Sequence, residues 1–147
     1  MRNAAHAAAS LSTALVLGFF PVSANAADRS VQLHFQNATQ ATLNIVTNKL
    51  LWGKWSTQDK PPQVVKSNGK VQFGSESDGF MTGTEGYVEF AMTTEPGIVR
   101  ISWDNPFFGS NSGSCSAPKG YVCQMSNISE NNSNYVVILR PGQNKRN

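Results

Sequence analysis

Residues 87–103, "YVEFAMTTEPGIVRISW", decide the fold class of this chain. Apolar side chains fill every second position on each side of a central Glu-Pro-Gly turn signal. The alternating residues are Val88, Phe90, Met92, Val99, Ile101 and Trp103. A period of two is typical of a strand that buries one face, and Pro followed by Gly marks a turn. The stretch therefore predicts two strands separated by a turn.

The same alternation recurs along most of the chain. Further alternating or apolar runs occupy residues 31–35, 43–45, 71–73 and 135–139, the last of them apolar on both faces. Turn signals at residues 37–40, 67–69 and 109–113 separate the runs, and no window shows a helical stripe. We therefore predict an all-β protein, an antiparallel β-sandwich with a barrel as the alternative, forming a single domain over residues 27–147.

The first 26 residues have the pattern of a secretory signal peptide. Arg2 gives a basic start, residues 11–20 are mainly apolar, and Ala24-Asn25-Ala26 is a small-x-small cleavage signal. The apolar run is too short to span a membrane. We expect cleavage after Ala26 and a secreted protein.

Charge limits the class of partner. The chain carries a formal net charge of +3, and loss of Arg2 with the leader leaves 11 basic and 9 acidic residues, a net charge of +2. Nucleic-acid binding needs a dense basic surface, so nucleic acid is not an expected partner. A charge of this size permits weak attraction to an anionic membrane.

Two cysteines, Cys115 and Cys123, lie in a Ser- and Gly-rich region. In an exported protein they predict a disulfide, which by loop-closure entropy contributes about 2.5 kcal/mol. A redox pair or a zinc site is the alternative, but zinc needs two more ligands and only His34 remains after the leader. We expect no metal and no cofactor.

Candidate catalytic groups are few. His34 lies on the polar side of a predicted strand, and no nucleophile-elbow motif is present. Glu76, Asp78, Glu85 and Glu89 form an acidic cluster that could supply a glycosidase pair or a loose calcium site, or simply be strand and loop charges. We predict no catalytic residues and no enzyme.

Aromatic residues gather in "LLWGKWST", residues 50–57, and "ISWDNPFFGSNSGS", residues 101–114. Trp52 and Trp55 are three apart, so in an extended chain they face opposite ways and one can be core while the other is exposed. Phe107 and Phe108 follow a proline and precede a Gly-Ser loop, so at least one should lie near solvent. Exposed rings beside Lys54 suit a lipid interface, although each single ring could equally be core.

Two long motifs carry a family resemblance. The segments "SDGFMTGTEGYVEF", residues 77–90, and "VRISWDNPFFGSNSGS", residues 99–114, closely resemble the aegerolysin family. They are most similar to its bacterial branch, which includes the small subunit of a binary insecticidal crystal toxin. Fungal members are similar more distantly, through Trp52-Gly53-Lys54 and part of the second motif. Asn105 and Phe107 stand where the fungal motif has Cys and Trp. A Glu of the fungal lipid binders falls near Thr82 here, so the fungal lipid preference is not carried over.

The resemblance implies a β-sandwich that binds membrane lipids. Several family members recognise sphingolipid-containing membranes and act with a larger pore-forming protein, and others are called haemolysins or insecticidal proteins. Our hypothesis is a secreted lipid-binding protein of this kind, a cytolysin or insecticidal toxin component with a pore-forming partner. The alternative is a secreted carbohydrate-binding module, because exposed rings also stack on sugars.

The sequence thus nominates seven lipid-binding residues and a role for the glycines between them. The candidates are Trp52, Lys54, Trp55, Glu85, Trp103, Phe107 and Phe108. Thr82, Thr84 and Glu85 can tie backbone amides in the turn before the strand. Alternatively, Glu85 faces the ammonium of a phosphoethanolamine headgroup, and Lys54 or a backbone amide faces its phosphate. Gly83 and Gly86 are predicted to let the chain turn sharply before the strand at residues 87–92.

Overall fold

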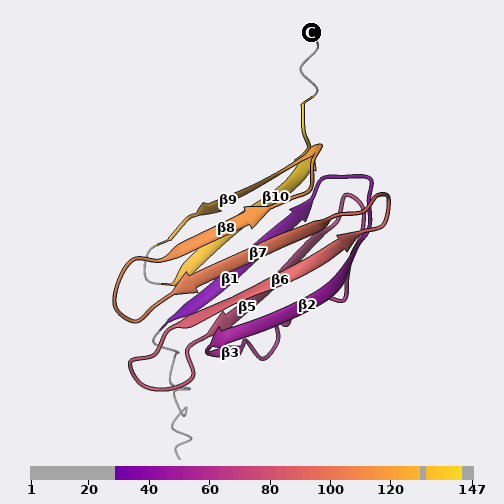
Figure 1. Cartoon of the computed structure of the whole chain (residues 1–147). Helices are drawn as coiled ribbons and strands as arrows, with labels where there is room; N and C mark the ends of the chain where they lie inside the picture. Colours follow the sequence, from indigo (N-terminus) through magenta and orange to yellow (C-terminus); the bar gives the residue numbers. More distant parts are fainter. Residues whose placement is uncertain (1–28, 130–131, 144–147) are drawn as a thin grey trace, which may run out of the picture.

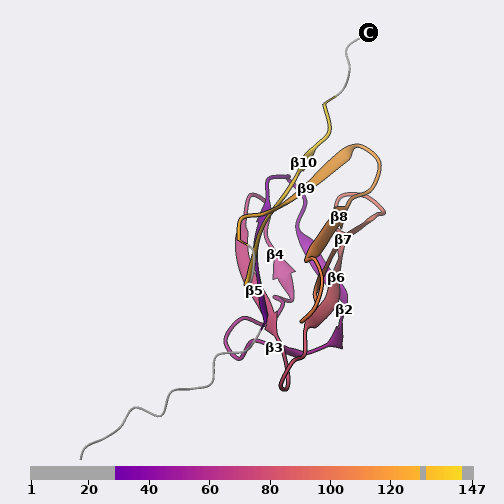
Figure 2. The same cartoon turned by 90° about the vertical axis from the view of Figure 1, so that its left-hand side faces the viewer.

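The computed structural model describes residues 29–129 and 132–143, and these residues form two five-stranded sheets packed face to face (Figures 1 and 2). The all-β sandwich predicted from alternation is confirmed. No described residue belongs to a helix long and apolar enough to cross a membrane. The expected signal peptide, residues 1–26, lies outside the described residues.

Each sheet has five strands in a defined order. The first sheet runs β3 (Lys54–Trp55), β5 (Lys70–Glu76), β1 (Ser30–Asn37), β10 (Ser133–Pro141) and β9 (Tyr121–Asn127). The second runs β4 (Val64–Val65), β2 (Leu43–Trp52), β6 (Thr84–Met92), β7 (Ile98–Asn105) and β8 (Ser112–Ser116). The deciding stretch forms the β6–β7 hairpin, in which Val88 pairs with Ile101 and Phe90 with Val99.

Three local expectations are corrected. The strand pairs are antiparallel except β1–β10, in which the first and last strands of the chain lie side by side in the first sheet and run parallel. The predicted turn at residues 109–113 is shorter, since Ser112 already begins β8. Strand β10 buries only one face: Tyr135 and Val137 are buried, whereas Val136 is half-buried.

The core lies between the sheets and consists of the alternating apolar residues. Phe35 of the first sheet stacks on Phe90 of the second, with ring centroids 5.8 Å apart. The fully buried side chains include Leu33, Leu43, Phe73, Val88, Val99, Ile101, Val137 and Leu139. Each buried aliphatic or aromatic side chain contributes about 1.5–3 kcal/mol, so this layer is the main source of stability.

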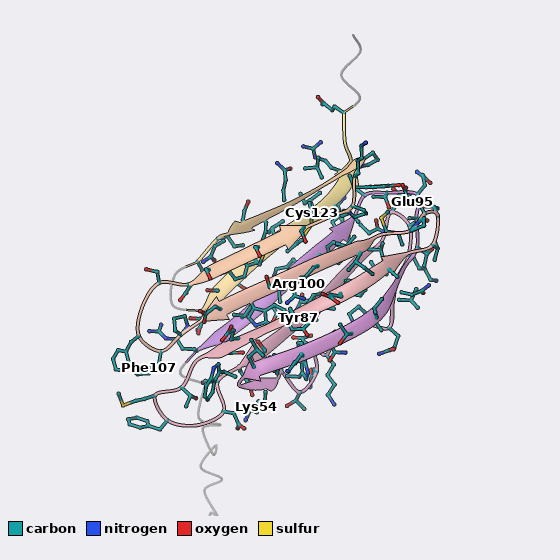
Figure 3. The ribbon with its side chains drawn as sticks, in the orientation of Figure 1. Lys54, Tyr87, Glu95, Arg100, Phe107 and Cys123 are labelled. Carbon is teal, nitrogen blue, oxygen red and sulfur yellow. A yellow bond between two sulfur atoms is a disulfide. The ribbon has the colours of Figure 1, made fainter. Side chains whose placement is uncertain are left out.

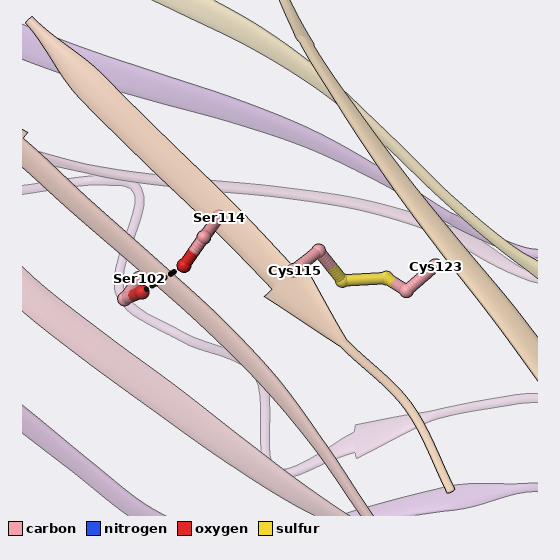
Figure 4. Close-up of a disulfide and its surroundings, with 4 residues drawn as sticks. All are labelled: Ser102, Ser114, Cys115 and Cys123. Atoms are coloured by element: carbon pink, nitrogen blue, oxygen red, sulfur yellow. Dashed lines mark hydrogen bonds between the residues drawn. A yellow bond between two sulfur atoms is a disulfide. The ribbon is translucent and has the colours of Figure 1, made fainter. Parts of the chain in front are cut away.

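The predicted disulfide between Cys115 and Cys123 is present and joins the two sheets (Figure 4). Cys115 lies on β8, an edge of the second sheet, and Cys123 lies on β9, an edge of the first. Their Cα atoms are 5.5 Å apart. The bond therefore closes one side of the sandwich across a short connection.

Candidate functional site

One end of the sandwich carries large apolar side chains that face solvent. Trp52 ends β2 and is 66% exposed, Phe80 in the β5–β6 loop is 85% exposed, and Phe108 in the β7–β8 loop is 74% exposed. Met81 is also exposed, and Phe107 is half-buried beside Phe108. We call these five residues the aromatic tip; the loop that carries the labelled Phe107 projects from the sandwich in Figure 3.

The chain path explains why the two neighbouring tryptophans separate. Trp52 belongs to the second sheet and Trp55 to the first, and Gly53 between them has φ of 86°. That left-handed conformation suits glycine, and a Cβ at Gly53 would lie 2.4 Å from the Glu76 carbonyl oxygen. The chain thus crosses between sheets here, leaving Trp52 exposed while Trp55 packs against the core, as the spacing predicted.

Gly83 and Gly86 do not make the turn that the sequence predicts for them. The left-handed positions are Gly79, with φ of 128°, and Met81, with φ of 57°. A Cβ at Gly83 would lie 2.5 Å from the Asn105 carbonyl oxygen, and one at Gly86 would lie 2.6 Å from the Lys49 carbonyl oxygen. Gly83 and Gly86 therefore permit close packing, whereas Gly79 and Met81 make the turn.

Polar contacts from two segments that are distant in the sequence support the β7–β8 loop. The Arg29 guanidinium donates to the Phe107 carbonyl oxygen at 2.8 Å and lies over the Phe107 ring, 5.5 Å from its centroid. The Phe107 and Phe108 rings meet edge to face with centroids 4.7 Å apart. Asn111 Nδ2 donates to Ser133 Oγ at 2.7 Å. Phe108 is therefore presented outward from an anchored loop.

A buried layer lies directly beneath the tip. Trp103 is only 2% exposed, and its Nε1–H donates to Ser75 Oγ at 2.9 Å. Thr84 Oγ1 donates to the same Ser75 oxygen at 2.6 Å, so one serine of the first sheet ties two strands of the second. Trp55 meets the Trp103 ring edge to face at 5.8 Å. Trp103 is thus a core residue, which corrects the expectation that it contacts lipid.

The tip encloses a shallow hollow of about 380 Å³, which we call the tip hollow. Trp52, Met81, Phe107 and Phe108 supply its apolar lining. Glu85 and Asp104 also line it and face each other as register partners on β6 and β7. The hollow therefore places acceptor oxygens beside exposed rings, a combination suited to an amphiphile with a donor-bearing head.

Comparison with known proteins identifies the family. The aegerolysin family model matches residues 28–147. The chain belongs to the aegerolysin family. Among curated proteins, an uncharacterised protein of Dictyostelium discoideum is 32% identical over 69 residues, which cover 47% of this chain and 6% of that protein. This chain therefore spans a small fraction of the relative's length.

Among solved structures, the lipid-binding protein Nakanori is similar with a TM-score of 0.65. The match covers 75% of this aegerolysin and 70% of Nakanori at 11% identity, and so it concerns the fold.

Lys54 and Glu85, both nominated from the sequence, lie in different surroundings in this aegerolysin. Glu85 lines the tip hollow, whereas Lys54 is outside its lining. The Lys54 ammonium lies 3.6 Å from a carboxylate oxygen of Glu76 and 3.6 Å from one of Asp78. Its charge is thus already balanced by two neighbours.

The other charged candidates are dispersed. His34 is exposed on the outer face of the first sheet, as predicted for a strand residue. Glu76 and Asp78 pair with Lys54, and Glu89 pairs with Arg100 on the second sheet. Within the described ranges, no three His, Cys, Asp or Glu residues are grouped so as to hold a metal ion.

Two tyrosines have raised pKa values. Burial raises the pKa of Tyr135 above its usual value of 10.0, opposed by a Ser133 hydrogen bond and reinforced by the Asp104 charge. A hydrogen bond to Glu95 raises the pKa of Tyr121 from 10.0. The Tyr121 phenol therefore keeps its proton at neutral pH and donates a hydrogen bond to Glu95 Oε1.

Proposed function

We propose that this aegerolysin binds membrane lipids through the aromatic tip. The observation that carries the proposal is the convergence of Trp52, Phe80 and Phe108, from three separate segments, at one end of the sandwich. Exposed apolar patches of this kind are typical of interaction surfaces. Transfer of each ring from water into a bilayer interface supplies roughly 2–3 kcal/mol. Family membership and the lipid-binding Nakanori, which shares the fold, support the same conclusion.

The headgroup proposal rests on the polar part of the tip hollow. Glu85 and Asp104 lie next to the rings, where they can accept hydrogen bonds from an ammonium group of a phosphoethanolamine head. Because Lys54 is held by Glu76 and Asp78, we favour backbone amides of the tip loops as the donors to phosphate. Sphingolipid-containing membranes are our proposed targets.

The wider role follows from the resemblance of the two motifs. We propose a secreted cytolysin or insecticidal toxin component that is exported by the leader at residues 1–26 and recruits a larger pore-forming protein once bound. The role proposed for the protein is binding, without turnover of a substrate.

A liposome flotation assay tests the lipid proposal. The variant combining Trp52→Ser, Phe80→Ser and Phe108→Ser should lose more than about a hundredfold in affinity, because three ring contributions are removed. The matched control replaces three exposed apolar residues away from the tip, Val46, Val64 and Ile98, by Ser. Liposomes should span sphingolipid contents. Equal losses in both variants, or no flotation of the folded parent on any composition, would refute the proposal.

A further inference from the structure

We propose that the outer face of the second sheet carries a binding site for a neutral sugar, alongside the aromatic tip. A hollow of about 410 Å³ opens there across β6, β7 and β8, and we call it the sheet trough. Figure 3 labels two of its lining residues, Tyr87 and Arg100, in the middle of this face.

Strand register arranges the trough's polar side chains as a grid. One row across the three strands is Glu85, Asp104 and Ser112, and the next is Tyr87, Ser102 and Ser114. Neighbouring strands are about 4.8 Å apart, and alternate residues along a strand about 6.8 Å apart. The grid therefore spans roughly 7 by 10 Å, which is comparable with a hexose or a disaccharide.

The grid offers both donors and acceptors. The carboxylates of Glu85 and Asp104 accept hydrogen bonds from sugar hydroxyls, and the serine hydroxyls can donate or accept. Ser102 Oγ and Ser114 Oγ already share a hydrogen bond at 2.8 Å, which fixes their position. Arg100, at the inner end of the trough, has five N–H groups and engages only part of them with Glu89. A polyol could use all of these groups at once.

The walls of the trough are held in place before any ligand arrives. The Arg100 guanidinium lies on the Tyr87 ring, 3.7 Å from its centroid, and pairs with the Glu89 carboxylate. Leu51 lines the trough as well, while small serines on β7 and β8 leave space above the sheet. A pre-arranged polar surface loses less conformational entropy on binding, which favours recognition of a weakly held ligand such as a sugar.

Charge separates a sugar from other polar ligands. The trough's charged lining residues are Glu85, Asp104 and Arg100, a formal net charge of −1, so phosphate and sulfate are disfavoured. An ammonium group would engage the two carboxylates and leave the Tyr87 row unused. Like charges directly opposite across a strand pair are unfavourable, and hydroxyls that donate to both carboxylates would offset that repulsion.

The sugar could be a free glycan or the head of a glycolipid. Glu85 and Asp104 line both the sheet trough and the tip hollow, so a sugar in the trough would lie beside the rings. The glycolipid case rests on the proposed membrane binding, whereas the free-glycan case is independent of it.

Titration of the purified protein with neutral mono- and disaccharides, followed by NMR, tests the site. Ser114→Tyr should fill the trough and weaken saturable binding by at least about tenfold. Ser116→Tyr is the matched control, because Ser116 is exposed on the same strand and face but lies outside the trough lining. Ser112→Tyr provides a second blocking variant if Ser114→Tyr does not fold.

Liposomes with and without a neutral monohexosylceramide distinguish the two sources. If the trough binds the head of a glycolipid, the parent should bind liposomes with the hexosylceramide more tightly than liposomes without it, and Ser114→Tyr should abolish that difference. Binding to the sugar-free liposomes then measures the contribution of the aromatic tip alone. If only free saccharides bind, the source is a soluble glycan and the trough assignment stands. Absence of saturable binding to any saccharide in either form would overturn the proposal. Equal weakening of saccharide binding by Ser114→Tyr and Ser116→Tyr would also overturn it. The same holds if phosphocholine or phosphoethanolamine binds saturably and Ser114→Tyr weakens that binding as much as it weakens saccharide binding.

Discussion

Trp52 and Trp103 belong to two layers of the same end of the molecule, and their surroundings differ completely. Trp52 stands in solvent with Phe80 and Phe108, whereas Trp103 is buried and donates to Ser75. The exposed rings of the outer layer, such as Trp52, have few packing and hydrogen-bond partners, whereas the buried rings of the inner layer, such as Trp103, have many. We therefore expect the proposed membrane binding to depend on residues whose removal costs the fold little, while the residues beneath them hold the two sheets together.

The largest expected effect comes from the inner layer. Trp103→Ala should lower the free energy of unfolding by about 3–5 kcal/mol, because it leaves a cavity and removes one of the two hydrogen-bond donors to Ser75. Trp52→Ala should change it by no more than about 0.5 kcal/mol, as is usual for exposed positions. Urea unfolding followed by circular dichroism measures both. Similar losses in the two variants would show that the layers are not energetically distinct.

The disulfide should come next in size. Replacing Cys115 and Cys123 by Ala should lower the free energy of unfolding by about 2.5 kcal/mol, through the greater entropy of the unfolded chain. Thermal unfolding of the double variant, compared with the parent with and without reductant, measures the effect.

If the bond only closes the side of the sandwich, liposome binding well below the melting temperature should be retained by the cysteine double variant. Loss of binding in a fully folded variant would instead place the β8–β9 side within the lipid contact.

Gly83 connects the two layers and should give an intermediate effect. A Cβ there would lie 2.5 Å from the Asn105 carbonyl oxygen and 2.7 Å from Pro106 Cα, both backbone atoms that give way poorly. Gly83→Ala should therefore cost about 1–3 kcal/mol and displace the loop that carries Phe108. Thermal unfolding and liposome flotation together measure the two consequences.

Gly120→Ala is the control for Gly83. Gly120 has φ of 92° and no atom within 4 Å of a Cβ, so its substitution strains the backbone without crowding a neighbour. Both variants should lose stability, but only Gly83→Ala should weaken flotation. If Gly83→Ala binds liposomes as tightly as the parent, the position of the loop that carries Phe108 does not determine binding.

The fold was largely predictable because alternation is a local property of the chain. Residues 87–103 contain most of both strands and the turn of the β6–β7 hairpin, and the buried positions follow from their period of two. The parallel β1–β10 pair was not predictable in this way. Its two strands are at opposite ends of the sequence, and alternation is the same whether a neighbouring strand runs parallel or antiparallel.

The candidate site was predictable only in part. Trp103 shares its alternation with Val99 and Ile101, so the sequence contained the signal that places it in the core. Phe80 and Met81 were not nominated, although an apolar pair between glycines, outside any alternating run, could have indicated exposed loop residues. The sheet trough depends on the register of three strands, which no single segment encodes.

A small effect on both stability and binding is expected for Lys54, which, like Trp55, is nominated by the sequence but lines neither hollow. Its side chain is about half exposed, and its pairs with Glu76 and Asp78 are each 3.6 Å long. Exposed pairs of this kind contribute about 0–1 kcal/mol, so Lys54→Met should change the free energy of unfolding by no more than that amount. Flotation on sphingolipid liposomes should change less than in the Phe108→Ser variant, because Lys54 contacts carboxylates and not the tip rings. If Lys54→Met weakened flotation as much as Phe108→Ser does, in low and in high salt alike, Lys54 would leave its carboxylates to bind a lipid phosphate. Lys54 would then belong to the lipid-binding layer.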